Sequence, residues 1–142
     1  MTPELFEQIR PFVTVYGNGL VNINTAPREV LGALGFSGEG VETITRYRAG
    51  SDGVEGTSDD KFFTNTGTIL TDLATKGDKP LDTTQEVVLE SLLTASRLGV
   101  SSTAFGVLSH AVLAKNGASL DVEAVVDRQG RILYSRASEV KL

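Results

Sequence analysis

The chain changes character near residue 99, and this change constrains its fold more than any other feature. Before residue 99, short apolar stretches at helical spacing alternate with glycine, aspartate and threonine, whereas three runs rich in β-branched residues follow it. Residues 1–98 hold 8 Lys/Arg and 14 Asp/Glu, and residues 99–142 hold 5 and 4. We therefore predict an α+β fold, with a small domain of short helices over residues 1–98 and a three-stranded antiparallel sheet over residues 99–142.

Capping residues and apolar spacing locate the helices of the first part. Thr25 is expected to cap a helix that carries Pro27 in its first turn. Ser37 is expected to cap the next helix, which Gly50 ends. The remaining elements predicted in this part are an extended segment over residues 12–23 and short helices starting near residues 3, 69 and 83.

Three strands are predicted in the second part from turn residues and alternation. Asn116-Gly117 and Gln129-Gly130 are two-residue turn signals that separate runs over residues 104–114, 120–127 and 131–137. Apolar and charged residues alternate along the middle run, so one face of the sheet should be apolar and packed against another layer. Either the helical part or an element that this sequence lacks would supply that layer. The side chains expected on this packed face are Leu120, Val122, Ala124, Val126, Ile132 and Tyr134.

The composition excludes several classes of function. The absence of cysteine excludes a disulfide scaffold, a thiol catalyst and zinc sites built on thiolates. A net charge of −5 argues against non-specific binding to nucleic acid or to anionic lipid. No apolar run reaches the roughly 18–20 residues of a membrane span. Because the sequence opens on MTPE, we expect the natural protein to be longer than this chain.

An acidic loop over residues 50–61 carries the clearest candidate binding site. Asp52, Glu55, Asp59 and Asp60 lie close together and are interleaved with glycines that permit tight turns. Calcium binds six to eight carboxylate and carbonyl oxygens on such chains. The spacing is not that of an EF-hand. We therefore predict Asp52, Glu55, Asp59 and Asp60 as candidate ligands of a calcium ion, with a solvated acidic loop as the alternative.

The segment over residues 21–27 and the two helices after it are similar to helix-hairpin-helix modules, which bind DNA phosphates with backbone amides. Here the connection lacks the usual alternation of glycines and apolar residues, and it places Glu39 where a phosphate would lie. Arg46 and Arg48 are the nearby cations. A packing role for this helix pair is therefore favoured over nucleic-acid binding, and Asn22 and Asn24 are expected to make local backbone hydrogen bonds.

The single histidine, His110, does not form a catalytic pair with its neighbour Ser109. Adjacent residues of a strand point to opposite faces, so the two side chains cannot meet. We expect His110 to be a partly buried structural residue. No set of side chains in the sequence assembles into an active site, so the chain is expected not to be an enzyme. Of the three functions considered, a structural protein, a nucleic-acid-binding module and a hydrolase, the hydrolase has the least support.

Several segments together resemble the GspK family, the largest minor pseudopilin of type II secretion systems. The resemblance rests on residues 12–16 (FVTVY), on residues 21–27 (VNINTAP) and on the closing strand sequences over residues 102–136. The Asn-x-Asn-Thr-Ala-Pro segment is its most specific part. The loop DGVEGTSDD over residues 52–60 is also similar to calcium loops among pseudopilins.

This resemblance implies a structural role in protein transport. Members of the family have a pilin-type domain with a helical insertion, and they cap the tip of a periplasmic pseudopilus with two other minor pseudopilins. The implied partners are those pseudopilins and an exported protein, with no nucleic acid and no catalysis. The full-length protein would be anchored in the inner membrane by an N-terminal helix that this sequence lacks. The helical region is short for the family.

Overall fold

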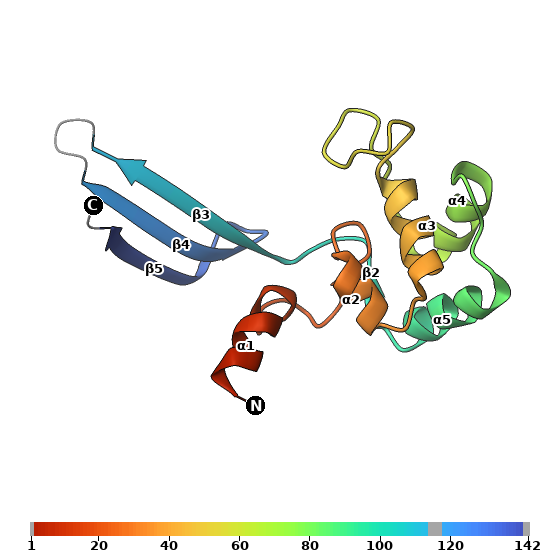
Figure 1. The fold of residues 1–142 in the computed structure, drawn as a ribbon, viewed down its shortest axis with the longest axis horizontal. Coiled ribbons are helices and arrows are strands. Elements are labelled where there is room, and N and C mark those ends of the chain that lie inside the picture. Colours follow the sequence, from red (N-terminus) through yellow and green to blue (C-terminus); the bar gives the residue numbers. More distant parts are fainter. Residues whose placement is uncertain (1, 114–117, 141–142) are drawn as a thin grey trace. The chain divides into compact units, whose positions relative to one another are not determined.

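The computed structural model describes residues 2–113 and 118–140, with the backbone alone for residues 139 and 140. Its contacts divide the chain into two compact units. The helical unit comprises the chain up to Val15 and Gly19–Ser101, and the sheet unit comprises Tyr16–Asn18 and the chain from Ser102 onward. The predicted α+β class, with the helical part before a three-stranded antiparallel sheet, is confirmed (Figure 1).

The helical unit consists of short elements joined by irregular segments. Its first and last strands, β1 and β2, pair in parallel through Val21 and Leu98, which brings the segments before α2 and after α5 together. Residues 12–23, predicted to be extended, contain only this two-residue strand and the end of a 3-10 turn. The elements are α1 (Pro3–Ile9), the 3-10 turn η1 (Arg10–Phe12), β1 (Val21–Asn22), α2 (Arg28–Ala33), α3 (Gly38–Arg48), the 3-10 turn η2 (Thr66–Thr68), α4 (Ile69–Lys76), α5 (Thr83–Thr94) and β2 (Leu98–Gly99).

The predicted boundaries of α3 are confirmed. The hydroxyl of Ser37 accepts a hydrogen bond from the Gly40 amide at 3.1 Å, which satisfies one of the unpaired donors at the helix start. Gly50 follows the helix with φ +65°, and a Cβ there would lie 2.4 Å from the Asp59 carbonyl oxygen. Gly50 is therefore required both by its backbone conformation and by the close approach of the loop.

Two other helix starts differ from the prediction. Thr25 does not cap α2: Pro27 holds the N-cap position and no side chain caps the helix. The reason is a local turn, because the Asn22 carbonyl already accepts the amides of Thr25 and Ala26. The cap of α5 is Asp82, one residue before the predicted start, and its carboxylate accepts the Gln85 amide at 2.9 Å.

The core of the helical unit is built from residues of α2, α3, α4, α5 and β2 and of several connecting segments. The rings of Tyr47 and Phe63 stack at the centre, with centroids 4.4 Å apart. This pair joins α3 to the chain that follows the acidic loop. The largest fully buried side chains, each less than 2% exposed, are Phe63, Ile23, Leu31, Ile44, Ile69, Leu73 and Leu89.

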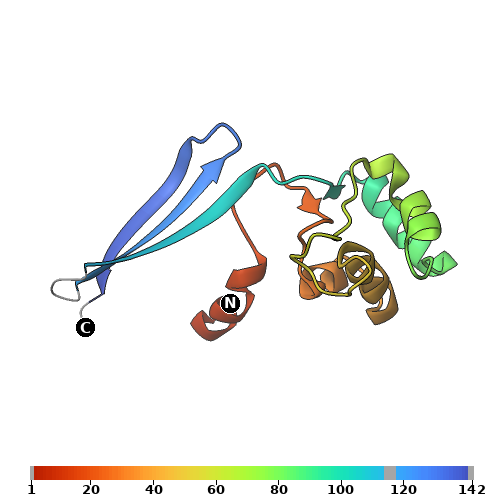
Figure 2. The same ribbon diagram turned by 90° about the horizontal axis from the view of Figure 1, so that it is seen from above.

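The sheet unit is a meander of β3 (Ala104–Val112), β4 (Ser119–Asp127) and β5 (Ile132–Val140), with β4 in the middle. Figures 1 and 2 show the three strands running side by side. The predicted turn at Gln129-Gly130 connects β4 and β5, and Gly130 has φ +78° there. The Asp127 carboxylate accepts the Gln129 and Arg131 amides at 2.9 Å each. The predicted Asn116-Gly117 turn lies outside the described residues.

The two faces of the sheet differ sharply in chemistry. Residues paired across antiparallel strands share a face. One face, here called the polar face, carries the cross-strand pairs His110–Asp121 and Glu123–Arg136, with Ser138 beside them. The other face, here called the apolar face, has no ionisable residue among the side chains that the structure describes. Its members are Phe105, Val107, Ser109, Ala111, Leu120, Val122, Ala124, Val126, Ile132, Ser135 and Ala137.

The prediction that Tyr134 shares the apolar face was wrong. Tyr134 pairs with Val125, whereas Ile132 pairs with Val126, so the register shifts by one residue between them. Such a β-bulge interrupts the alternation of side chains along the strand. Tyr134 therefore lies on the polar face, while the other five residues predicted for the apolar face do lie there.

Candidate functional site

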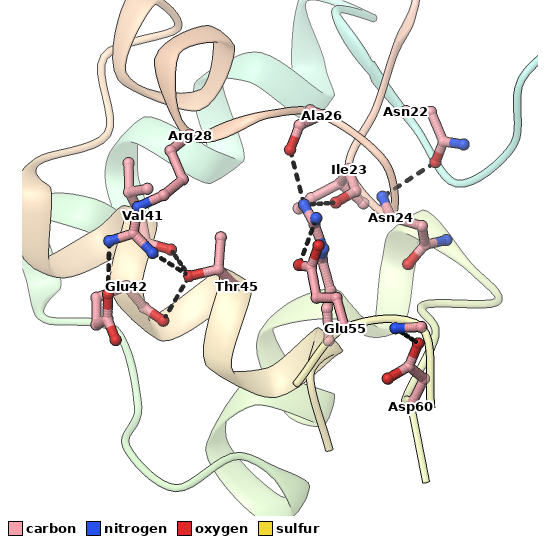
Figure 3. Close-up of polar contacts among 12 residues, drawn as sticks. Asn22, Ile23, Asn24, Ala26, Arg28, Val41, Glu42, Thr45, Glu55 and Asp60 are labelled. Carbon is pink, nitrogen blue, oxygen red and sulfur yellow. Dashed lines mark hydrogen bonds and ion pairs between the residues drawn. The ribbon is translucent and has the colours of Figure 1, made fainter. Parts of the chain in front are cut away.

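The Asn-x-Asn-Thr-Ala-Pro segment makes both local and long-range hydrogen bonds, and Figure 3 shows its residues Asn22, Ile23, Asn24 and Ala26. The Asn22 carboxamide oxygen accepts the Asn24 amide at 3.0 Å, which is the local role predicted for it. The Asn24 side chain instead reaches distant segments. Its Nδ2 donates to the carbonyls of Phe63 at 2.8 Å and Val100 at 2.9 Å, and its Oδ1 accepts the Phe63 amide at 2.8 Å. The prediction of a local role was therefore wrong for Asn24.

Arg48 is the functional candidate that sequence reasoning missed. It is only 7% exposed, and one Nη donates to the carbonyls of Ala26 at 2.7 Å and Ile23 at 3.4 Å. The other Nη forms a 2.5 Å ion pair with Glu55. The available signal was helical spacing, because Arg48 lies seven residues after the buried Val41 and therefore on the same face of α3.

The four carboxylates predicted as calcium ligands make different contacts in the structure. Glu55 is held by Arg48, which places its carboxylate against the helical core. Asp52 accepts the Val54 amide at 2.8 Å, and Asp60 accepts the Gly56 amide at 2.8 Å. Within the part of the chain that the structure describes, no three acidic or histidine side chains are grouped so as to hold a metal ion.

Asp59 organises the acidic loop. One carboxylate oxygen accepts the amide and hydroxyl of Ser51, both at 2.7 Å, and the amide of Asp52 at 3.0 Å. The other oxygen accepts the Thr57 hydroxyl at 2.6 Å. Hydrogen bonds from the Thr57 and Ser51 hydroxyls, and then from the Asp52 and Ser51 amides, hold the pKa of Asp59 well below its usual range. Asp59 is therefore ionised throughout the physiological pH range.

Asp60 retains an unused acceptor. Its Oδ1 is buried and has no hydrogen-bond partner, while its Oδ2 accepts the Gly56 amide. A buried carboxylate oxygen without a donor is unfavourable unless a cation or a water molecule satisfies it. Among the predicted ligands, Asp60 therefore provides the oxygen best suited to a cation.

The connection between α2 and α3 does not present free amides in the manner of a DNA-binding hairpin. The Gln85 side chain accepts the Ser37 amide at 2.8 Å, and Ser37 in turn accepts the Gly40 amide. Glu39, at the expected phosphate position, forms an ion pair with Lys79. The buried guanidinium of Arg48 points into the protein. These contacts support packing as the role of the helix pair.

His110 is exposed, so the prediction of partial burial was wrong. Its imidazole lies on the polar face of the sheet and contacts the carboxylate of Asp121, which is its cross-strand neighbour. Ser109 belongs to the opposite face, as the strand alternation predicts. A shallow hollow of about 510 Å³ beside this pair is lined by polar-face residues such as Glu123 and Arg136. Among the described residues, the hydrogen-bond contact of the His110 imidazole is with the Asp121 carboxylate.

Comparisons with protein-family models, with curated proteins and with solved structures gave no match to this chain. Among the described residues, no helix combines the length and the apolar character needed to cross a membrane. The fold and the contacts above therefore define a class in physical terms: a helical unit with its own core, joined to an antiparallel sheet that is apolar on one face.

Proposed function

We propose that this chain is the helical domain and closing sheet of a minor pseudopilin similar to the GspK family. In this proposal the protein is a structural component of a type II secretion system, located at the tip of a periplasmic pseudopilus. Its partners are other minor pseudopilins and, through them, exported protein. The full-length protein is anchored in the inner membrane by an N-terminal helix.

The contrast between the two sheet faces carries the proposal. The apolar face keeps large exposed side chains, including Phe105 at 43%, Val107 at 44% and Ile132 at 67%. Antiparallel sheets with one apolar face require a second layer, and a pilin-type domain supplies a long apolar helix as that layer. The central position of Asn24 adds support, because it gives the most family-like segment a structural purpose within the helical unit.

The test has a genetic and a biochemical arm. The coding sequence upstream of Met1 should encode an apolar run of about 20 residues, the length of a membrane-spanning helix. The protein should also form a stable complex with the soluble domains of the minor pseudopilins encoded beside it. A natural protein without such an apolar run, or one that binds none of those domains, contradicts the proposal.

We further propose that calcium draws Asp52, Asp59 and Asp60, which the structure does not group around one point, together around a single ion, with Glu55 remaining on Arg48. The unpaired buried oxygen of Asp60 supports this site. A bound cation would supply positive charge to a loop whose three aspartates otherwise repel one another. Calcium would be favoured over magnesium, because a flexible loop of mixed oxygen ligands does not impose a small octahedral shell.

Thermal melts with calcium, with magnesium and with chelator test this site. Binding to the folded state alone raises stability by RT ln(1 + [L]/Kd), about 2.7 kcal/mol at a hundredfold excess of calcium over Kd. Asp60→Asn should remove the calcium-dependent shift. Asp78→Asn, which alters an exposed carboxylate paired with Arg46 at 3.9 Å, is the matched control and should retain the shift. A wild-type midpoint that does not respond to calcium contradicts the site.

A further inference from the structure

The two edge strands of the sheet differ in how they are protected against pairing with another strand. In the order β3-β4-β5, the strands β3 and β5 each pair on one side only, within the described part of the chain. An edge strand presents unpaired backbone groups, and proteins usually protect it with charged residues or proline. β5 carries Arg136 at its middle, whereas the nine residues of β3 (AFGVLSHAV) include no aspartate, glutamate, lysine, arginine or proline.

Leu108, at the centre of β3, does not fit its surroundings. It belongs to the polar face, directly opposite Glu123, yet it is the most exposed large apolar side chain of the sheet at 85%. Burial of an apolar side chain contributes roughly 25 cal/mol per Å² of area removed from water. A second strand beside β3 would cover Leu108, while the Glu123–Arg136 pair joins β4 to β5 and lies away from this edge.

We propose that β3 is a pairing edge through which two copies of this chain form one continuous antiparallel sheet about a two-fold axis at Leu108. In this arrangement Leu108 lies opposite Leu108 of the second copy. Val107 lies opposite Ser109 of the second copy, and Gly106 lies opposite its His110. Because paired residues share a face, the apolar faces of both copies fall on the same side of the combined sheet.

Charge explains why β3 rather than β5 is the pairing edge. The middle residue of β5 is Arg136, so the same two-fold arrangement would place two guanidinium groups directly opposite each other. Like charges at directly opposed positions destabilise a strand pair. At the middle of β3 the corresponding pair is two leucines. The proposal rests on the sheet alone and does not depend on the pseudopilin assignment.

Sedimentation equilibrium of the full chain tests the pairing edge. The wild-type chain should form dimers, and Leu108→Lys should raise the dissociation constant of the dimer about tenfold or more. The thermal midpoint of the Leu108→Lys variant at low protein concentration should equal that of the wild type, because Leu108 is exposed. Ser138→Lys, on the same face of the other edge strand, is the matched control and should dimerise like the wild type. A wild-type chain that stays monomeric, or a dimer that Leu108→Lys does not weaken, overturns the proposal.

A cross-linking experiment tests the position of the axis without relying on a destabilising charge. The chain contains no cysteine, so a single introduced thiol reports on one site. Directly opposed residues of antiparallel strands have Cα atoms about 4.5–5.5 Å apart, within the range of a disulfide. Leu108→Cys should therefore form a covalent dimer under mild oxidation, and Ser138→Cys should not. Equal cross-linking of both variants overturns the proposed axis.

Discussion

The two units of this protein bury their apolar side chains to different extents. In the helical unit, seven large side chains are less than 2% exposed, and they come from segments between Ile23 and Leu89. In the sheet unit, the described residues that are buried are Ser119 and Asp127, at 9% exposure each, whereas Phe105 and Val107 remain exposed. The helical unit therefore closes its own core, whereas the sheet unit buries few of its side chains.

The largest effect expected from this difference is that of truncating an apolar residue in each unit. Ile44 is fully buried, so Ile44→Ala should lower the free energy of unfolding by about 2–5 kcal/mol. Ile132 is 67% exposed, so Ile132→Ala should change it by no more than about 0.5 kcal/mol. Urea denaturation followed by circular dichroism measures both. Equal losses in the two variants would break the comparison.

The second effect concerns the buried guanidinium of the helical unit. Arg48→Met should lower the free energy of unfolding by about 1–3 kcal/mol, because the Ala26 carbonyl and Glu55 lose their donor. Arg28 forms a 2.5 Å ion pair with Glu42 at the surface, where both side chains are about half exposed. Arg28→Met should therefore cost about 0–1 kcal/mol.

The same pair of arginine variants also distinguishes a loop anchor from a general stabilising residue. If Arg48 holds the acidic loop through Glu55, limited proteolysis within residues 51–58 should accelerate in Arg48→Met and stay at the wild-type rate in Arg28→Met. Unchanged cleavage of the loop in Arg48→Met would show that the ion pair does not position it.

The smallest effect is the pH dependence of the acidic loop. The hydrogen bonds to Asp59 lower its folded-state pKa, so their stabilisation is fully present above the unfolded-state value of about 3.9 and is lost as pH falls through the folded-state value. A carbon-13 titration of the Asp59 carboxyl group should give a midpoint well below 3.9. In Thr57→Ala, which removes one donor, the midpoint should rise. A wild-type midpoint at or above about 3.9 would contradict the loop geometry.

The parts of the fold that sequence reasoning predicted are those decided by neighbouring residues. Ser37 and Gly50 mark the start and the end of α3 through local contacts and backbone angles. The alternation along β4 likewise depends only on the side chains of that strand. Thr25 failed as a cap because the carbonyl of Asn22 formed a competing turn. Tyr134 was assigned to the wrong face because a bulge interrupts the period of two.

The candidate site was less predictable because its contacts join distant segments. Asn24 bonds to residues 39 and 76 positions away, and no spacing in the sequence encodes those partners. Glu55 was grouped with three aspartates because it lies near them along the chain, and in the structure it forms an ion pair with Arg48. A cluster of carboxylates in the sequence therefore indicates a charged loop. Which of these carboxylates can bind a cation depends on their contacts in the folded protein.

Hydrogen exchange of the full chain, followed by mass spectrometry at a concentration low enough to keep it monomeric, tests the central claim most directly. Amides of α3 and α5 should exchange slowly and together, through global opening of the helical unit. Amides of β3, β4 and β5 should exchange faster, because the sheet unit buries few of its side chains. Protection of the sheet equal to that of the helices would contradict this difference in burial between the two units.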